Sequence, residues 1–204
     1  MDCLFRVKTI TLETANVTNC HVIATDILFL SSNHRSVQFL YLAASVDKMN
    51  LAFERVLECF KLQNLKDSQR EALQNVVKGQ DVLVIQPTGS GKSLIFQSAP
   101  IVFDTVRPLT NAKSIALVIS PLSSLMQDQG RYLKSVGIKA EFIGDEQESE
   151  EAKQLVERGE CQIVYGSPEA FLSTKRWRTM LSNDPYKKRL CLVAVGEAHC
   201  ISHW

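Results

Sequence analysis

Residues 81–93 read DVLVIQPTGSGKS, and this stretch decides the fold of the chain. Residues 82–85 form a short apolar run, which predicts a strand buried in a sheet. A glycine-rich loop follows, and Lys92 and Ser93 then lead into LIFQSA, a run that suits a helix. A strand, a glycine-rich loop ending in Gly-Lys-Ser and a helix, in this order, are typical of a phosphate-binding loop.

The chemistry of this loop follows from its residue types. Gly89 and Gly91 allow a tight turn in which successive backbone N–H groups point at one anion, and the start of the helix adds partial positive charge. Lys92 would reach the β- and γ-phosphates of a nucleotide, and the Ser93 hydroxyl would bind Mg²⁺. The usual pattern begins with glycine, where this chain has Gln86. A glycine turn with a chance Gly-Lys-Ser is the alternative, which the flanking strand and helix disfavour.

Length and composition indicate a globular protein. The chain has 204 residues, 45% of them hydrophobic, which suits one large domain, alone or with an extension. The net charge of +1 does not indicate nucleic acid, so any surface for nucleic acid must be local. Six scattered cysteines without a Cys-x-x-Cys pair predict reduced thiols in an intracellular protein. Neither a leader nor a long apolar run occurs, so we expect no secretion and no membrane span.

The beginning of the chain is the least informative part. Residues 1–48 mix β-branched and apolar runs without a charge run or a low-complexity tract. They could form a strand or a helix packed on the main domain, or have no fixed structure. We therefore treat 1–48 as an unassigned N-terminal extension and 49–204 as the main domain, with Met49 as an alternative start.

Downstream of residue 49, apolar runs alternate with segments of helical periodicity. We predict strands over 82–85, 115–120, 139–144, 161–167 and 189–196. Helices are predicted over 50–60, 69–78, 93–97, 122–136, 145–159 and 170–181, with loops over 103–113 and 182–188. Pro100 is expected to close the third helix. This alternation indicates an α/β fold, a parallel sheet with helices on both faces, in which ligands bind beyond the carboxyl ends of the strands.

Four further stretches carry polar residues, most of them near predicted strand ends. They are LKDSQREAL (65–73), SPLSSLMQDQ (120–129), GSPEAFL (166–172) and VAVGEAHCISHW (193–204). The amide of Gln69 could read the edge of an adenine, although a solvated glutamine at a helix start is the simpler alternative. The second stretch suits a nucleic-acid backbone and ordinary helix capping equally well. Taken alone, the third is only a turn before a helix, and Glu197 in the fourth is only an exposed residue at a strand end.

Together these stretches resemble the RecQ-like DNA helicases, within the wider group of helicases that bear a DEAH-type box. In that family a Gln motif precedes PTGxGKS, SPLxSLMxDQ, a PE motif and DEAHCxSxWG, and this chain is similar in order and spacing from about Phe60 to Trp204. SPLSSLMQDQ and EAHCISHW differ from the corresponding residues of the DEAD-box RNA helicases. The resemblance implies a P-loop NTPase of RecA-like fold, ATP and Mg²⁺ as cofactors, and ATP hydrolysis coupled to 3′-to-5′ unwinding of DNA.

The resemblance also implies a role for each matching residue. Binding of ATP falls to Lys66, Gln69, Pro87, Thr88, Gly89, Ser90, Gly91, Lys92 and Ser93, with Ser93 on the metal ion. Catalysis falls to Lys92, to Glu197, which would activate water, and to His199, which would couple the ATP site to bound DNA. Contacts to DNA fall to Ser120, Pro121, Ser123, Gln127, Ser167, Pro168 and Trp204. No zinc site is expected in this portion, because no clear second ligand pair accompanies His199 and His203.

Two features depart from the family pattern. Gly196 stands where the family has an aspartate that holds Mg²⁺, which predicts a loss of turnover on the order of a hundredfold or more. The sequence ends at Trp204, so we expect a first motor domain without the second one that would complete the ATP site. The alternatives are a non-catalytic ATP- or DNA-binding module and an incomplete gene product. A nuclear location is implied by the family alone, because no run of Lys or Arg indicates an import signal.

Overall fold

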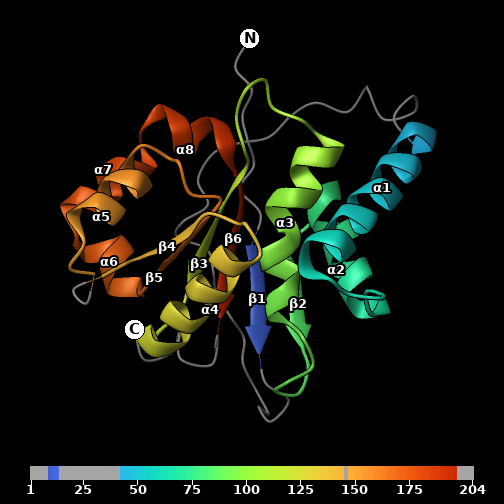
Figure 1. Ribbon diagram of the computed structural model, residues 1–204, viewed down its shortest axis with the longest axis horizontal. Coiled ribbons are helices and arrows are strands. Elements are labelled where there is room, and N and C mark those ends of the chain that lie inside the picture. The colour runs from blue at the N-terminus through green and yellow to red at the C-terminus, as the bar shows by residue number, and fades with distance from the viewer. Residues whose placement is uncertain (1–8, 14–41, 145–146, 197–204) are drawn as a thin grey trace.

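The fold is a parallel sheet between two layers of helices (Figure 1). The computed structural model describes residues 9–13, 42–144 and 147–196. Its strands are β1 (Thr9–Glu13), β2 (Val82–Ile85), β3 (Ile115–Ile119), β4 (Ala140–Ile143), β5 (Ile163–Gly166) and β6 (Leu190–Gly196). Its helices are α1 (Leu42–Phe60), α2 (Asp67–Lys78), α3 (Ser93–Val106), α4 (Ser123–Ser135), α5 (Glu150–Glu157), α6 (Pro168–Ser173), α7 (Lys175–Leu181) and α8 (Asp184–Arg189). The six strands are parallel in the order β2-β1-β6-β3-β5-β4, which confirms the predicted α/β class.

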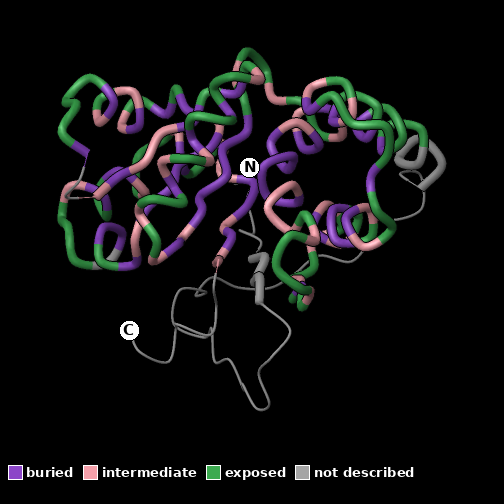
Figure 2. The backbone as a smooth tube through the Cα atoms, turned by 60° about the horizontal axis from the view of Figure 1, so that its bottom comes forward, coloured by how far each residue is buried: buried purple, intermediate pink, exposed green. Residues whose placement is uncertain are grey.

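Alternating side chains of the central strands divide the core into one apolar cluster on each face of the sheet. On β3, Ala116 and Val118 belong to the cluster under α1–α4, whereas Ile115 and Leu117 belong to the cluster under α5–α8. A strand covered on both faces must be apolar at every position, which is why these strands appear in the sequence as uninterrupted apolar runs. Buried residues follow the strands and the inner sides of the helices (Figure 2).

The strand before the phosphate-binding loop is less buried than its apolar sequence predicts. Val84 belongs to the cluster under α1–α4, but Leu83 and Ile85 are each 55% exposed. The cluster under α5–α8 contains no residue of β2 among the described residues, since those helices pack over β3, β4, β5 and β6. The prediction of a buried strand is therefore correct for one face of β2 only.

One strand of the sheet comes from the predicted N-terminal extension. Leu12 of β1 pairs with Val84 of β2 on one side and with Gly196 of β6 on the other. Within the described ranges β2 stands at the end of the strand order, so its ladder is made with β1 alone. Of the alternatives for the extension, a strand packed on the domain is correct for residues 9–13. Residues 1–8 and 14–41 lie outside the described residues.

The expectation that Pro100 closes the third helix is wrong. Helix α3 continues to Val106 with Pro100 buried in its interior. A proline in this position removes one hydrogen bond and costs about 3 kcal/mol. Beyond it, Val102 and Phe103 are buried in the cluster under α1–α4, and such burial contributes about 1.5–3 kcal/mol per side chain. Burial thus offsets the cost of the proline, and the predicted loop over 103–113 begins only after α3 ends.

After β5 the described chain forms α6, α7 and α8, where the sequence predicts one helix and a turn. Thr174 has an extended backbone and separates α6 from α7. Helix α8 occupies most of the predicted turn, because Tyr186 is fully buried and its hydroxyl donates to the Val156 carbonyl at 2.6 Å. A tertiary contact thus stabilises a helix that is too short to be recognised from its own periodicity. Compared with the predictions, α1 starts earlier and α5 is shorter.

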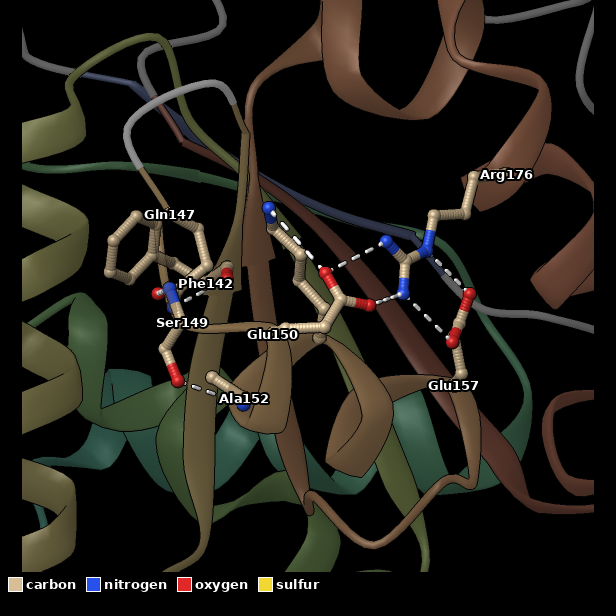
Figure 3. Close-up of polar contacts among 8 residues, drawn as sticks. Phe142, Gln147, Ser149, Glu150, Ala152, Glu157 and Arg176 are labelled. Atoms are coloured by element: carbon tan, nitrogen blue, oxygen red, sulfur yellow. Dashed lines mark hydrogen bonds and ion pairs between the residues drawn. The ribbon is translucent and has the colours of Figure 1, made fainter.

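Arg176 joins helices α5 and α7 through two carboxylates (Figure 3). Its guanidinium donates to Glu157 at 2.6 and 3.0 Å and to Glu150 at 2.6 and 3.4 Å. These hydrogen bonds hold the pKa of both glutamates below the ordinary value and raise the pKa of Arg176. The start of α5 is capped by Ser149, whose hydroxyl accepts the backbone N–H of Ala152 at 3.2 Å.

The described cysteines are free thiols, as their scattered spacing predicts. They are Cys59, Cys161 and Cys191. Burial raises the pKa of Cys161 to about 12, so this thiol stays protonated near neutral pH and is a poor nucleophile. Within the described ranges, no helix combines the length and the apolar character needed to cross a bilayer.

Candidate nucleotide-binding site

The stretches that carry chemistry gather at one edge of the sheet. The phosphate-binding loop follows β2, Ser120 follows β3, Ser167 follows β5, and Gly196 is the last residue of β6. Because these strands are parallel, their carboxyl ends meet at the same edge, which is where ligands bind in such sheets. The fold therefore brings these residues to one side of the domain.

The loop between β2 and α3 turns through two glycines in left-handed conformations. The backbone angle φ is +78° at Gly89 and +90° at Gly91, values at which a residue with a Cβ atom is strained. A Cβ atom on Gly91 would also lie 2.8 Å from Nε2 of Gln69. The Ser90 hydroxyl is buried and has no hydrogen-bond partner among the described residues. Since buried hydroxyls are nearly always paired, this group fits a phosphate oxygen entering the loop.

The Lys92 side chain folds back onto the phosphate-binding loop that precedes it. Its ammonium donates to the carbonyl oxygens of Gln86 at 2.8 Å and of Pro87 at 2.9 Å. A phosphate anion is a stronger acceptor for an ammonium than a neutral carbonyl, so a bound phosphate can take over these hydrogen bonds. Pro87 and Thr88, which are also predicted to contact the nucleotide, are exposed.

The Gln motif supports the loop from the start of α2. Nε2 of Gln69 donates to the Gly91 carbonyl at 2.9 Å, and Oε1 of Gln69 accepts the backbone N–H of Lys66 at 2.9 Å. The Lys66 ammonium donates to the Ser90 carbonyl at 2.7 Å. Gln69 is only 4% exposed. Its amide therefore braces the loop in this structure, and the contact of Gln69 with adenine stays a prediction.

Ser93, the predicted metal ligand, lines a cleft beside the loop. The cleft is bounded by residues of α3 and α4 and of the ends of three strands: Lys92, Ser93, Phe96, Val118, Ser120, Leu125, Met126, Gln129, Tyr165 and Gly196. Ser93 is half-buried in the first turn of α3, and its Oγ accepts a hydrogen bond from Nε2 of Gln129 at 3.3 Å. Sequence reasoning missed Gln129 as a site residue. Gln129 and Ser93 are 36 positions apart, so no local pattern indicates that they meet. The one available signal was that Gln129 is the last residue of the SPLSSLMQDQ stretch.

Gly196 contributes no side-chain oxygen to this cleft, although the cleft has space for one. A Cβ atom built on Gly196 would lie 3.7 Å from the Ile119 carbonyl oxygen, an ordinary van der Waals contact. Neither space nor backbone conformation therefore requires glycine at this position. The Cβ atom that any other residue type carries, including the aspartate that the resemblance implies, therefore fits at this position.

The cleft offers Mg²⁺ one oxygen ligand from the protein among the described residues. The Ser93 hydroxyl is a hard oxygen ligand of the kind that Mg²⁺ prefers, and this ion commonly completes its shell with water and phosphate oxygens. The buried Tyr165 hydroxyl makes no hydrogen bond of normal geometry with a described residue, although Gln97 lies near it, and burial raises its pKa. It is thus a neutral, buried polar group that supplies no charged ligand to a metal ion. These residues fit Mg²⁺ carried by nucleotide phosphates, with Ser93 as the ligand from the protein.

The stretch predicted to contact DNA spans the end of β3 and the start of α4. Ser120 is only 5% exposed; its N–H donates to the Gly166 carbonyl at 3.0 Å, and its Oγ accepts the N–H of Leu122 at 3.4 Å. Ser123 and Gln127 are four residues apart on α4, on the same side of the helix, and both are partly exposed. Ser120 is therefore the least accessible of these residues, and contact with DNA stays a prediction for all of them, including the partly exposed Pro121.

Ser167 and Pro168 form an ordinary helix start. The Ser167 hydroxyl accepts the N–H of Ala170 at 3.2 Å, and Pro168 is the first residue of α6. Capping accounts for both residue types, and their contact with DNA stays a prediction. Glu197, His199 and Trp204 lie outside the described residues.

Comparisons with known proteins identify the family of this chain. Residues 66–204 match the family model of the DEAD/DEAH box helicases. The ATP-dependent DNA helicase RecQ of Haemophilus influenzae is 36% identical over 148 residues, which are 71% of this chain and 22% of that protein. The ATP-dependent helicase SGS1 of Saccharomyces cerevisiae is 35% identical over 153 residues, which are 74% of this chain and 10% of that protein. The chain thus spans less than a quarter of the length of these two relatives.

A solved structure supports the fold. The crystal structure of the DUF1998 helicase MrfA is similar with a TM-score of 0.52 and 20% sequence identity over 72% of this chain and 29% of that chain. This likeness concerns the architecture alone, which is that of a RecA-like helicase domain. Since the family match begins at Lys66 and includes the phosphate-binding loop and the cleft, the chain belongs to the DEAD/DEAH box helicase family, within which it is similar to the RecQ helicases.

Proposed function

We propose that this chain is the ATP-binding motor domain of a RecQ-like helicase that couples ATP hydrolysis to 3′-to-5′ unwinding of DNA. The observation that carries the proposal is the loop itself. Its Ser90 hydroxyl has no partner among the described residues, its Lys92 ammonium donates to carbonyl oxygens, and Ser93 lines the adjacent cleft. The names of the two relatives support ATP as the nucleotide, and the name of the first supports DNA as the substrate. Unwinding is proposed for a complete helicase of this type, because the chain covers only a small share of each relative.

Each predicted site residue has a separate role in the proposed reaction. Ser90 and the N–H groups of the loop bind the phosphates, and Lys92 neutralises charge on the β- and γ-phosphates. Ser93 holds Mg²⁺, which when bound spreads the negative charge of the transferred phosphoryl group. Glu197 orients the attacking water and accepts its proton, and His199 couples this step to DNA.

Binding of a fluorescent ATP analogue to the full chain, in the presence of MgCl₂, tests the nucleotide site. Lys92→Ala should weaken binding by roughly tenfold or more, because hydrogen bonds to charged groups contribute about 1.5–3 kcal/mol. Lys139→Ala is a matched control, since Lys139 is an exposed lysine just before β4, at the opposite edge of the sheet. Equal binding by the wild-type chain and Lys92→Ala would contradict the proposal.

Gly196 favours a second candidate function, a module that binds ATP or DNA without turnover. A glycine at the end of β6 supplies no carboxylate to hold the metal ion in position for hydrolysis. Phosphate release measured with and without single-stranded DNA distinguishes the two functions. Turnover stimulated by DNA supports the motor domain, whereas tight binding without turnover supports the module.

The nuclear location implied by the resemblance belongs to the same proposal. One relative comes from a bacterium and the other from a yeast, so similarity supports this location only for a eukaryotic chain. Imaging of a fluorescent fusion of the chain in eukaryotic cells tests it, and exclusion from the nucleus would contradict it.

A further inference from the structure

We infer that Gln129 is a positioning residue that holds the Ser93 hydroxyl in place for the metal ion; the inference rests on the proposed nucleotide site. Nε2 of Gln129 donates to Oγ of Ser93 at 3.3 Å. The contact joins the second turn of α4 to the first turn of α3 and lies in the cleft that Gly196 also lines. No role for this glutamine follows from the helix that carries it, because α4 would form equally well with other residues there.

The chemistry of a hydroxyl explains what this contact does. The serine oxygen has one proton to donate and two lone pairs to accept with. When Gln129 occupies one lone pair, the other lone pair stays available for a cation and the proton for a phosphate oxygen. The contact also restricts the Ser93 side chain to one rotamer, so that less conformational entropy is lost when a ligand is bound. Because the amide is neutral, it orients the oxygen without competing electrostatically for the cation.

Two other polar side chains of the cleft have different partners, and the Tyr165 hydroxyl has none among the described residues. Lys92 donates to loop carbonyls, and the Ser120 hydroxyl accepts from Leu122. Gly196 has no side chain that could orient Ser93 or share the metal ion. In the described part of this cleft, Gln129 is thus the side chain that fixes the Ser93 oxygen, and its importance rises because the family aspartate is missing.

A titration of MgCl₂ at constant concentration of a fluorescent ATP analogue tests this assignment without relying on turnover. The full-length wild-type chain is compared with Gln129→Met, which keeps the volume of the side chain and removes the N–H donor. The apparent affinity for Mg²⁺ should fall by roughly two- to tenfold, the range expected for one hydrogen bond. Binding of the analogue in excess EDTA should not change, because Ser93 then has no metal ion to hold.

Two further variants make the test specific. Ser93→Ala should reduce the apparent Mg²⁺ affinity, and adding Gln129→Met to it should produce no further loss, since both changes remove the same interaction. Gln154→Met on α5 is the matched control, because Gln154 is exposed and lies on another helix. Circular dichroism melts verify that every variant is folded.

The outcomes separate the inference from the proposed function. An unchanged Mg²⁺ dependence in Gln129→Met overturns the inference while the nucleotide site stands. Additive losses in the double variant overturn it as well, because they assign Gln129 a role independent of Ser93. A wild-type chain that binds no analogue at any Mg²⁺ concentration overturns the proposed function and the inference together.

Discussion

Gln69 and Gly91 hold the phosphate-binding loop against helix α2. Nε2 of Gln69 donates to the Gly91 carbonyl at 2.9 Å, and a Cβ atom on Gly91 would lie only 2.8 Å from the same nitrogen. The loop can approach the glutamine this closely because residue 91 has no side chain. One residue type thus serves two purposes here, a left-handed backbone and a close contact.

Gly91→Ala should therefore destabilise the domain and weaken nucleotide binding. The left-handed backbone alone costs a residue with a Cβ atom about 1–2 kcal/mol, and Gln69 must also move. Urea denaturation measures the free energy of unfolding, and the fluorescent ATP analogue measures binding. Gly130→Ala is the control, since Gly130 lies within α4 with no heavy atom within 4 Å of its added Cβ. That variant should be stabilised by about 0.5–1 kcal/mol, and equal behaviour of the two would contradict the explanation.

Gly196→Asp should strengthen metal-dependent binding of the nucleotide. The added Cβ atom would have an ordinary contact of 3.7 Å, so the fold should tolerate the change. The carboxylate supplies a charged oxygen, which the described residues of the cleft lack, and turnover with DNA present should rise by up to about a hundredfold. Gly196→Asn has nearly the same shape without the charge and is the control. No difference between the two variants in Mg²⁺ dependence would sink the idea.

A chain that starts at Leu42, the first residue of α1, should be less stable than the full chain. It lacks β1, whose residues Ile10 to Glu13 pair with Val82 to Ile85. Strand β2 would then lose the ladder that connects the phosphate-binding loop to β6 in the described sheet. A chain that lacks only residues 1–8 retains β1 and is the control. Thermal unfolding followed by circular dichroism gives the answer, and equal melting temperatures would show that β1 contributes nothing.

Arg176→Gln should make the free energy of unfolding less dependent on pH in the acidic range. Arg176 lowers the folded-state pKa of Glu150 and Glu157 from their ordinary value of 4.5 by hydrogen bonding and charge. A lowered folded-state pKa contributes stability that is present above pH 4.5 and is lost as the pH falls below it. The wild-type chain should therefore be the more stable one at neutral pH, and the difference should shrink in acid.

The dependence of stability on salt concentration distinguishes the electrostatic effect of Arg176 from an effect of its packing. The three side chains are partly exposed, so added NaCl should reduce the advantage of the wild-type chain. Arg131→Gln removes a more exposed pair with Asp128 and should change little. A pH-independent difference between wild type and Arg176→Gln would mean that packing of the arginine, not its charge, stabilises the two helices.

Local patterns predict much of this fold because they depend on residues close together in the sequence. Strand β3 is apolar at every position since both of its faces are covered, and Gly79 ends α2 with a left-handed backbone, as its residue type indicates. The same locality explains the failures. Pro100 is tolerated in α3 because residues beyond it are buried, and α8 forms because Tyr186 finds a buried partner on α5.

The sequence by itself determined the phosphate-binding loop, the parallel α/β class and the family, because each follows from residue types at fixed short spacings. Only the tertiary structure decided that β1 lies between β2 and β6, that Gln69 braces the loop, and that Gln129 meets Ser93. Each of these contacts joins residues separated by 22 or more positions. Such contacts form when the chain packs its apolar faces, and no local pattern specifies which polar side chains that packing brings together.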